Sequence, residues 1–376
     1  MKPKNKQQIT KDSAYDAVAP GDFAAMIAVD RYGRRSTAFD KIISATHDHF
    51  WDPLDPKYVD FAEPFDLAKN ALLSPSSCFD LQTAIGDKLN EDQKRQLVND
   101  NAHWLLSTAL HGEQAALSLS ASLCHVLLDP GAQEYAANQA REEARHVTAF
   151  ARYIQTRWGK PAPVGEGTKQ LLTELVLTPL VWKKLVGMQI IVEGAAMGLF
   201  ASIYRDSTDP VLTRMVQLVS TDEAFHHKFG KIWADRTIPK LDQDEKNAIE
   251  DWAWEVWYGR AKGLLDPTEK PHIYAKLGLD PQWCQNAFME ALTDKKLREI
   301  FQDKANLFRT LAKTLLKAGI ITQRTAGNYA AFIDLAELHA EGEHTVGDDI
   351  AEEGIKRLRA LNGIGAKGAA SLQAAE

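Results

Sequence analysis

Two segments of the sequence match each other at a constant separation of 80 positions, and both carry potential metal ligands. Each segment has a lone glutamate followed 30 residues later by a Glu-x-x-His motif. Residues three positions apart share one face of a helix, so each motif can direct a carboxylate and an imidazole at one point. The six ligand candidates are Glu113, Glu143, His146, Glu193, Glu223 and His226.

Long stretches with helical spacing of apolar residues predict that the repeat is a duplicated helical hairpin. The expected helices cover about 92–128, 130–158, 168–205 and 210–236, with a kink at Pro179 in the third. An Asp-Pro pair, Asp129-Pro130 or Asp209-Pro210, ends the first helix of each hairpin and opens the second. Further helices are expected at 242–264, 281–292, 294–317 and 323–341. Strand signals are almost absent, so we expect an all-α protein built on a four-helix bundle.

The surroundings of the lone glutamates indicate that the six residues bind metal. Glu113 and Glu193 are both embedded in strongly apolar helical segments. Burying carboxylates without counter-charge is costly, whereas two divalent ions would supply four positive charges. Four glutamates and two histidines with internal two-fold symmetry match a carboxylate-bridged two-metal site in a helix bundle. Hard oxygen ligands with few imidazoles suit two iron ions, or manganese.

Three further residues are expected to lie beside the metal ligands and hold them in position. Glu142 and Asp222 precede the two motif glutamates at matching positions. A carboxylate there can accept the free ring N–H of a ligand histidine and fix its tautomer. We expect Arg145 to pair with one of these acids. The alternative is that the acids lie on the surface.

Composition gives the chain its general class. With 376 residues, 45% of them hydrophobic, it can bury a large core. The net charge of −7 indicates no general nucleic-acid binding, and three widely spaced cysteines form no disulfide framework. The N-terminus has no apolar run typical of a signal peptide, so we expect a cytoplasmic protein. The apolar segment 185–203 contains Gln189 and Glu193, which favours a buried core helix over a membrane span.

The expected organisation has four parts. Residues 1–91 form an arm with short helices, 92–236 the metal-binding bundle, and 237–341 helices packed on it, followed by a loosely held Gly/Ala-rich tail at 342–376. In that tail, the Gly-Ile-Gly turn within 358–372 is similar to a phosphate-gripping hairpin, although a plain Ala/Gly-rich tail is the alternative. It also matches G-x-G-x-x-G, but no strand precedes it.

The order of the ligand candidates resembles the ferritin-like di-iron carboxylate superfamily. Its relevant branch holds bacterial monooxygenase hydroxylases, acyl-carrier-protein desaturases and ribonucleotide reductase small subunits. The resemblance covers about 92–236 and implies a ferritin-like four-helix bundle with extra helices at both ends. Phe150 stands where reductase subunits carry a radical tyrosine, and Glu113 where they usually carry aspartate. Ala196 and Met197 stand where the oxygenases often have a threonine, and Val219 where N-oxygenases add a histidine.

The resemblance implies a non-haem di-iron oxidase or oxygenase that uses dioxygen to oxidise a small organic molecule. Such an enzyme takes electrons from an external donor, a reductase or ferredoxin, and we expect a homodimer. Two alternatives stay open: a radical-generating subunit like that of ribonucleotide reductase, and a metal-storage or peroxide-detoxifying protein. Apolar residues near the ligands are expected to line a substrate pocket: Leu110, Leu117, Phe150, Met197 and Phe200.

Overall fold

The computed structural model describes residues 14–19, 21–264 and 266–363, and this part of the chain is all-α. Its extended contacts there are two isolated bridges, Ala17–Leu127 and Leu73–Ser207. The α-helices are α1 (Phe23–Met26), α2 (Asp40–Thr46), α3 (Ala84–Asp87), α4 (Glu91–Leu123), α5 (Pro130–Trp158), α6 (Glu166–Leu177), α7 (Val181–Leu185), α8 (Glu193–Asp206), α9 (Pro210–Thr237), α10 (Gln243–Leu264), α11 (Pro271–Lys276), α12 (Pro281–Ala291), α13 (Asp294–Gln302), α14 (Leu307–Lys317), α15 (Ala326–Ala330), α16 (Leu335–Ala340) and α17 (Val346–Leu361). The 3-10 turns are η1 (Val29–Arg34), η2 (Thr37–Phe39), η3 (Pro75–Ser77), η4 (Phe79–Gln82), η6 (Ile238–Lys240) and η7 (Pro267–Glu269), while η5 (Val186–Val192) is a π-helix.

The two Asp-Pro pairs start helices as the sequence predicts. The side chain of Asp129 accepts a hydrogen bond from the amide of Gly131 at 2.8 Å, at the start of α5. Asp209 does the same for the amide of Val211 at 2.9 Å, at the start of α9. A carboxylate at this position satisfies an amide that the helix leaves free, and proline at the first helical position needs no donor.

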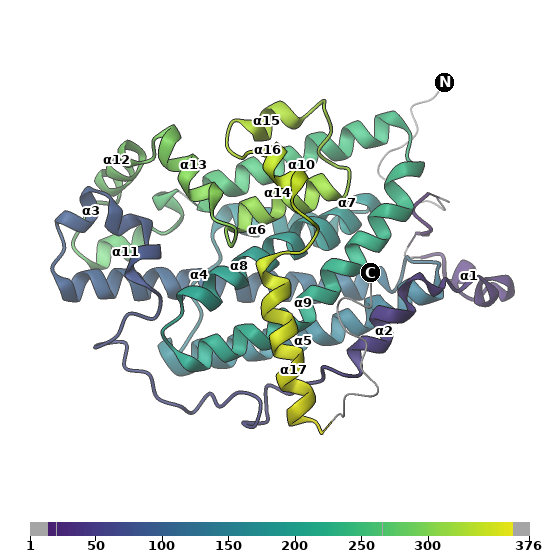
Figure 1. Cartoon of the computed structure of the whole chain (residues 1–376), viewed down its shortest axis with the longest axis horizontal. Helices are drawn as coiled ribbons and strands as arrows, with labels where there is room; N and C mark the ends of the chain where they lie inside the picture. Colours follow the sequence, from purple (N-terminus) through teal and green to yellow (C-terminus); the bar gives the residue numbers. More distant parts are fainter. Residues whose placement is uncertain (1–13, 20, 265, 364–376) are drawn as a thin grey trace.

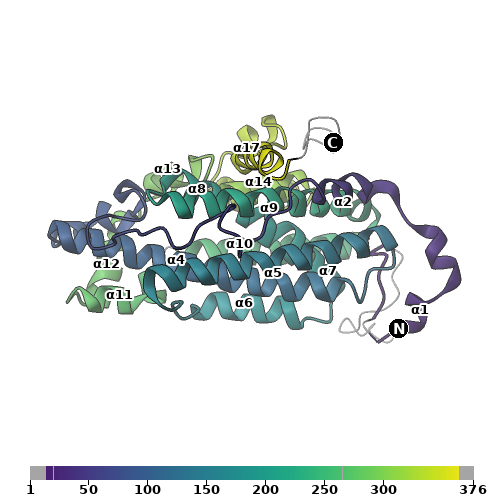
Figure 2. The ribbon, with the colours of Figure 1, turned by 90° about the horizontal axis from the view of Figure 1, so that it is seen from below.

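The long helices pack as two pairs, α4 with α5 and α8 with α9 (Figure 1). Seen from below, α17 lies outermost, followed by the level of α8 and α9, then that of α4 and α5, with α6 on the opposite side (Figure 2). The helices α3, α11 and α12 gather at one end of α4, and α1 and α2 lie toward the other (Figure 1). The ligand-bearing helices therefore lie between the levels of α17 and α6 (Figure 2).

The third long helix of the repeat is interrupted, where the sequence predicted one helix with a kink at Pro179. The chain leaves the helix after α6 and re-enters it at α7, and Thr178 and Leu180 have extended backbone angles. A residue before proline is disfavoured in helical conformation, which explains a break in place of a kink. The π-helix η5 then joins α7 to α8, directly before Glu193. Two predicted C-terminal helices are also split, 294–317 into α13 and α14 and 323–341 into α15 and α16.

A packed helix, α17, occupies part of the region that the sequence indicated as a loosely held tail. Its glycines allow close contact with the bundle. A Cβ atom built on Gly347 would lie 2.7 Å from Met197 Cε, and one on Gly354 would lie 2.5 Å from Thr221 Cγ2. These two glycines therefore permit tight packing of α17 on α8 and α9. The Gly-Ile-Gly turn lies almost entirely in residues 364–376, outside the described part of the chain.

One helical stretch of the described residues, Val181–Asp206, is long and apolar enough to cross a bilayer. Most of it is inside the protein, since 72% of its most apolar window is buried. It carries Glu193 toward the other ligand helices, as a core helix would.

Candidate metal centre

The structure brings all six predicted ligands together in the interior. The first helix of each pair supplies one glutamate, Glu113 from α4 and Glu193 from α8. The second helices, α5 and α9, supply the two Glu-x-x-His motifs. All six side chains are buried, and both histidines are 0% exposed. They form two overlapping groups that share Glu143 and Glu223, and within each group the potential ligand atoms lie within 4.8 Å of one another.

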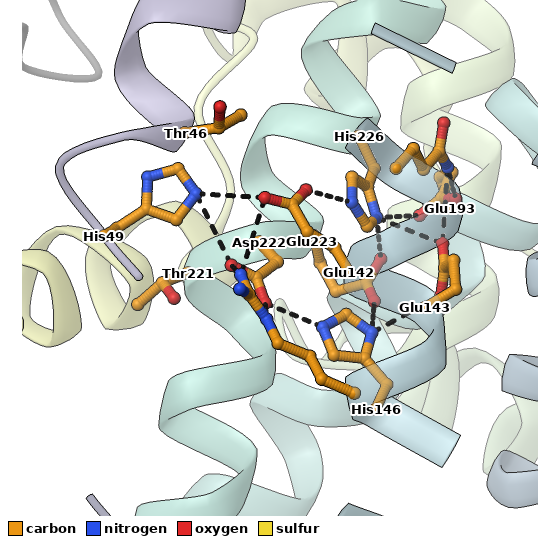
Figure 3. Close-up of polar contacts among 12 residues, drawn as sticks. Thr46, His49, Glu142, Glu143, His146, Glu193, Thr221, Asp222, Glu223 and His226 are labelled. Atoms are coloured by element: carbon orange, nitrogen blue, oxygen red, sulfur yellow. Dashed lines mark hydrogen bonds and ion pairs between the residues drawn. The ribbon is translucent and has the colours of Figure 1, made fainter. Parts of the chain in front are cut away.

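Each of the two shared glutamates directs one carboxylate oxygen at His146 and the other at His226 (Figure 3). His146 Nδ1 lies 3.3 Å from Glu143 Oε2 and 3.0 Å from Glu223 Oε1. His226 Nδ1 lies 3.2 Å from Glu143 Oε1 and 3.3 Å from Glu223 Oε2. This is the arrangement that two carboxylates need in order to bridge two ions, each of which also binds one imidazole.

The remaining two glutamates lie at opposite ends of the cluster. Glu113 Oε2 is 3.2 Å from His146 Nδ1, and Glu193 Oε2 is 3.7 Å from His226 Nδ1. The buried amide of Gln139 donates to Glu193 Oε1 at 2.6 Å and to Glu143 Oε1 at 3.3 Å. Gln189, in the π-helix, in turn donates to Gln139 at 2.9 Å. The amide pair fixes the position of Glu193 and links it to η5.

Each histidine turns its other ring nitrogen toward an acid on the opposite motif. His146 Nε2 is 2.8 Å from Asp222 Oδ2, and His226 Nε2 is 2.9 Å from Glu142 Oε2. When these nitrogens carry the proton, the Nδ1 lone pairs point at the cluster, as metal ligation requires. The sequence predicted that both acids would contact ligand histidines, and the structure places them there.

Arg145 and His49 complete this outer layer from two sides. Arg145 donates to Asp222 through Nε at 2.9 Å and to Glu142 through Nη2 at 3.4 Å, so it pairs with both acids and not with one. In the repeat, Phe225 of the second motif corresponds to Arg145 of the first. The ring of His49 stacks on the ring of Phe225, with centroids 4.6 Å apart. His49 Nε2 lies 3.4 Å from Asp222 Oδ1 and 3.7 Å from Glu142 Oε1 (Figure 3). The second motif has no arginine at the position of Arg145, and the imidazole of His49, from outside the repeat, lies beside the two acids on that side.

Protonation of the cluster follows from its burial. Burial raises the pKa of Glu113 and, together with the charge of Glu223, that of Glu193 well above 4.5. Burial alone would lower the pKa of both histidines. The hydrogen bond to Asp222 nevertheless raises the pKa of His146, and the charge of Glu143 raises that of His226, both well above 6.5. Without metal, these four residues therefore hold protons, which offset the negative charge of the carboxylates around them.

The donor set fits two divalent ions. The oxygen Glu143 Oε2 is buried and makes no well-formed hydrogen bond among the described residues, and His146 Nδ1, 3.3 Å away, would carry no proton as a metal ligand. A buried carboxylate oxygen without a donor is costly, and a cation beside it would remove that cost. Four carboxylates offset four positive charges, and oxygen with imidazole ligands and no thiolate suits iron or manganese. Arg145 supplies one further positive charge, which the two outer acids Glu142 and Asp222 share.

A cavity of about 170 Å³ opens onto the cluster and touches all four ligand glutamates. Apart from these acids its wall is mainly apolar, with residues from α4, α6, η5, α8, α10 and α14. Of the five residues expected to line a substrate pocket, only Phe200 is among the described residues of this wall. Leu110, Phe150 and Met197 are buried elsewhere in the core, and Leu117 is half-buried on α4. Neighbours on a helix point to different sides, so closeness in sequence to a ligand did not identify the wall.

Several residues at the site were not expected from the sequence: His49, Trp51, Gln139 and Gln189. Trp51 donates from Nε1 to Asp222 at 2.9 Å and stacks beside His146. A sequence signal exists for Gln139, which lies one helical turn before Glu143 and shares its face. His49 and Trp51 come from the irregular N-terminal region and reach the site through tertiary packing alone.

No protein-family model matches the chain, and a search of curated proteins finds no significantly similar sequence. The described part of the chain is an all-helical protein with a buried cluster of glutamates and histidines able to hold metal.

Proposed function

We propose that this chain is a non-haem di-iron oxidase or oxygenase that uses dioxygen to oxidise a small organic substrate. The observation that carries the proposal is the apolar cavity whose wall includes Glu113, Glu143, Glu193 and Glu223. A metal pair held only for storage or structure has no need of an apolar space at its ligands. An oxidase needs one, because the substrate must lie beside the metals.

Bound iron would supply the electrons and open coordination positions that activate dioxygen. The residues of the chain would do the rest. Phe200 and the aliphatic residues of the wall hold the substrate and exclude water from the reacting groups. Asp222 and Glu142 keep the two histidines in the ligating tautomer. Gln139 holds Glu193 by a hydrogen bond that would weaken if this carboxylate moved during turnover.

The finer features of the proposal follow from the resemblance to the ferritin-like di-iron superfamily. They are a ferritin-like bundle, a homodimer in the cytoplasm, and an external reductase or ferredoxin as electron donor. The radical-generating alternative is weaker, because Phe150 lies at the position where the reductase subunits carry their tyrosine.

The test is anaerobic loading with Fe(II), metal analysis, and an optical and electron paramagnetic resonance record after dioxygen is added. We expect two irons per chain, a transient visible band and no lasting tyrosyl radical. His226→Ala should bind one iron fewer, whereas His111→Gln serves as control, because His111 bonds to the carbonyl of Ala162 and lies outside the cluster. Iron uptake far above two per chain would favour storage, and a stable radical would favour the reductase-like alternative; either result contradicts the proposal.

A further inference from the structure

The cavity at the metal cluster has one cationic residue among its described wall residues, Arg260. Arg260 belongs to α10, outside the duplicated helical hairpins, and is half-buried. The rest of the wall is apolar or belongs to the ligand carboxylates, apart from Thr108 and Thr168. A guanidinium placed in such a wall loses part of its hydration, so its position calls for a specific partner.

The partners found within the described residues leave most of the guanidinium free. Its Nη2 donates to Thr168 Oγ1 at 2.7 Å, which is the one hydrogen bond that it makes there. Arginine has five N–H donors, so several remain for another molecule. No ion pair within 4.0 Å joins Arg260 to an acid of the described chain. Burial lowers the pKa of Arg260, and the charge of Glu269 opposes this only from a greater distance.

The guanidinium lies beside the N-terminus of a helix. Arg260 lies against the first turn of α6, since its Nη1 would be 3.1 Å from a Cβ built on Gly167. The N-cap residue of α6 is Gly165, which offers no side chain to its free amides. A helix N-terminus favours anions and disfavours a neighbouring cation. Two carboxylates lie at this turn: Glu166, which belongs to it, and Glu269, whose Oε2 would lie 2.7 Å from a Cβ on Gly165 and whose Oε1 would lie 3.5 Å from a Cβ on Gly167. Neither is within 4.0 Å of the Arg260 guanidinium.

We propose that the substrate is a small carboxylic acid, with its carboxylate on Arg260 and its apolar part in the cavity beside the metal ligands. This inference rests on the proposed function and names its substrate class. The cavity of about 170 Å³ is close to the 150 Å³ or so that holds a benzene ring, so one aromatic ring or a short alkyl chain fits. Pairing at Arg260 would direct the apolar end, with its oxidisable C–H bonds, at the cluster.

The experiment compares three probes with the same phenyl ring and polar groups of different charge, by calorimetry on the metal-loaded protein: phenylacetate, 2-phenylethanol and 2-phenylethylamine. We expect phenylacetate to bind about tenfold more tightly than the alcohol, or about 1.4 kcal/mol, and the amine to bind most weakly. Arg260→Met should remove the preference for the acid, and Arg260→Lys should keep part of it. Arg298→Met, which removes the same charge from an exposed position outside the cavity, should leave the preference unchanged.

Equal binding of acid and alcohol by the unaltered protein would overturn the inference, as would no binding of any probe. An acid preference that survives in Arg260→Met would also overturn it, because the carboxylate would then be bound by the metals. Should Arg260→Met fail to fold, the comparison of probes on the unaltered protein and on Arg260→Lys still decides. These binding results do not depend on dioxygen chemistry, so failure of the proposed reaction would be seen separately.

Discussion

The carboxylate of Asp222 offers a sharp test, because it holds one of the two ligand histidines and has a counterpart that holds the other. Asp222 accepts hydrogen bonds from Trp51, Arg145 and His146 at 2.8–2.9 Å. In Asp222→Asn the shape is kept, but the charge is lost and the amide NH₂ must face one of these donors. We expect His146 to lose its fixed tautomer and part of its basicity.

Loss of such a supporting acid typically weakens metal binding about 10–100-fold, which corresponds to about 1.4–2.7 kcal/mol. The weakened site should be the one formed with His146, whereas the site of His226 should change less. Glu142→Gln should give the reverse pattern, since Glu142 lies 2.9 Å from His226 Nε2. If each variant weakens a different metal site, the result would match the structure, in which the acid of each motif contacts the histidine of the other motif.

The assay is an anaerobic Co(II) or Fe(II) titration in competition with a chelator, fitted to two sites, with unfolding measured in parallel. Asp209→Asn is the matched control, because Asp209 is also buried and paired with an arginine, Arg157, but lies outside the cluster. It should lower stability without selecting either metal site. If Asp222→Asn leaves both metal affinities within about twofold of the original, the supporting role is refuted.

Three further predictions follow from burial and packing. The pKa values of the two ligand histidines, Glu113 and Glu193 are raised, so a metal ion that binds must displace protons. Metal affinity should therefore rise with pH, and the pH of a weakly buffered protein solution should fall as metal is added. No proton release would contradict this. Hydrogen bonds from Arg309 lower the pKa of Glu341 from 4.5 to about 2, so this carboxylate stabilises the fold above pH 4.5 and its contribution is lost as the pH falls through 2. Glu341→Gln should therefore cost about 1 kcal/mol in urea unfolding at pH 7, and much less at pH 2; an equal cost at both pH values would contradict this. A Cβ on Gly230 would lie 2.1 Å from the Gln189 carbonyl oxygen, so Gly230→Ala should lower stability by about 1–3 kcal/mol. Gly259 has open space around it, so Gly259→Ala should be neutral or raise stability by up to about 1 kcal/mol. Equal melting temperatures for the two variants would contradict the contact.

The internal repeat made the centre of this molecule predictable from its sequence. Helix type follows from apolar spacing, and the Asp-Pro pairs mark where α5 and α9 begin. Duplication then required the two Glu-x-x-His motifs to occupy equivalent places, so the sequence could indicate that Glu113 and Glu193 would join them. All six side chains, and the acids behind them, lie together as expected.

The parts that break the repeat were not predictable in the same way. The segment 186–192 is apolar except for Gln189, so its spacing fits an α-helix and a π-helix equally well. His49 is separated from Asp222 by more than 170 positions, and no local pattern links them. The glycines of α17 suggested looseness because glycine is flexible in an isolated chain, whereas here they permit close contact with Met197 and Thr221.

The central claim is that the six side chains hold a pair of metal ions, and anomalous diffraction from crystals of the iron- or manganese-loaded protein tests it most directly. We expect two anomalous peaks about 3.5–4 Å apart, one beside Nδ1 of His146 and one beside Nδ1 of His226, with Glu143 and Glu223 between them. A single peak, no peak, or a peak at the neighbouring group of His49, Glu142 and Asp222 would contradict the claim.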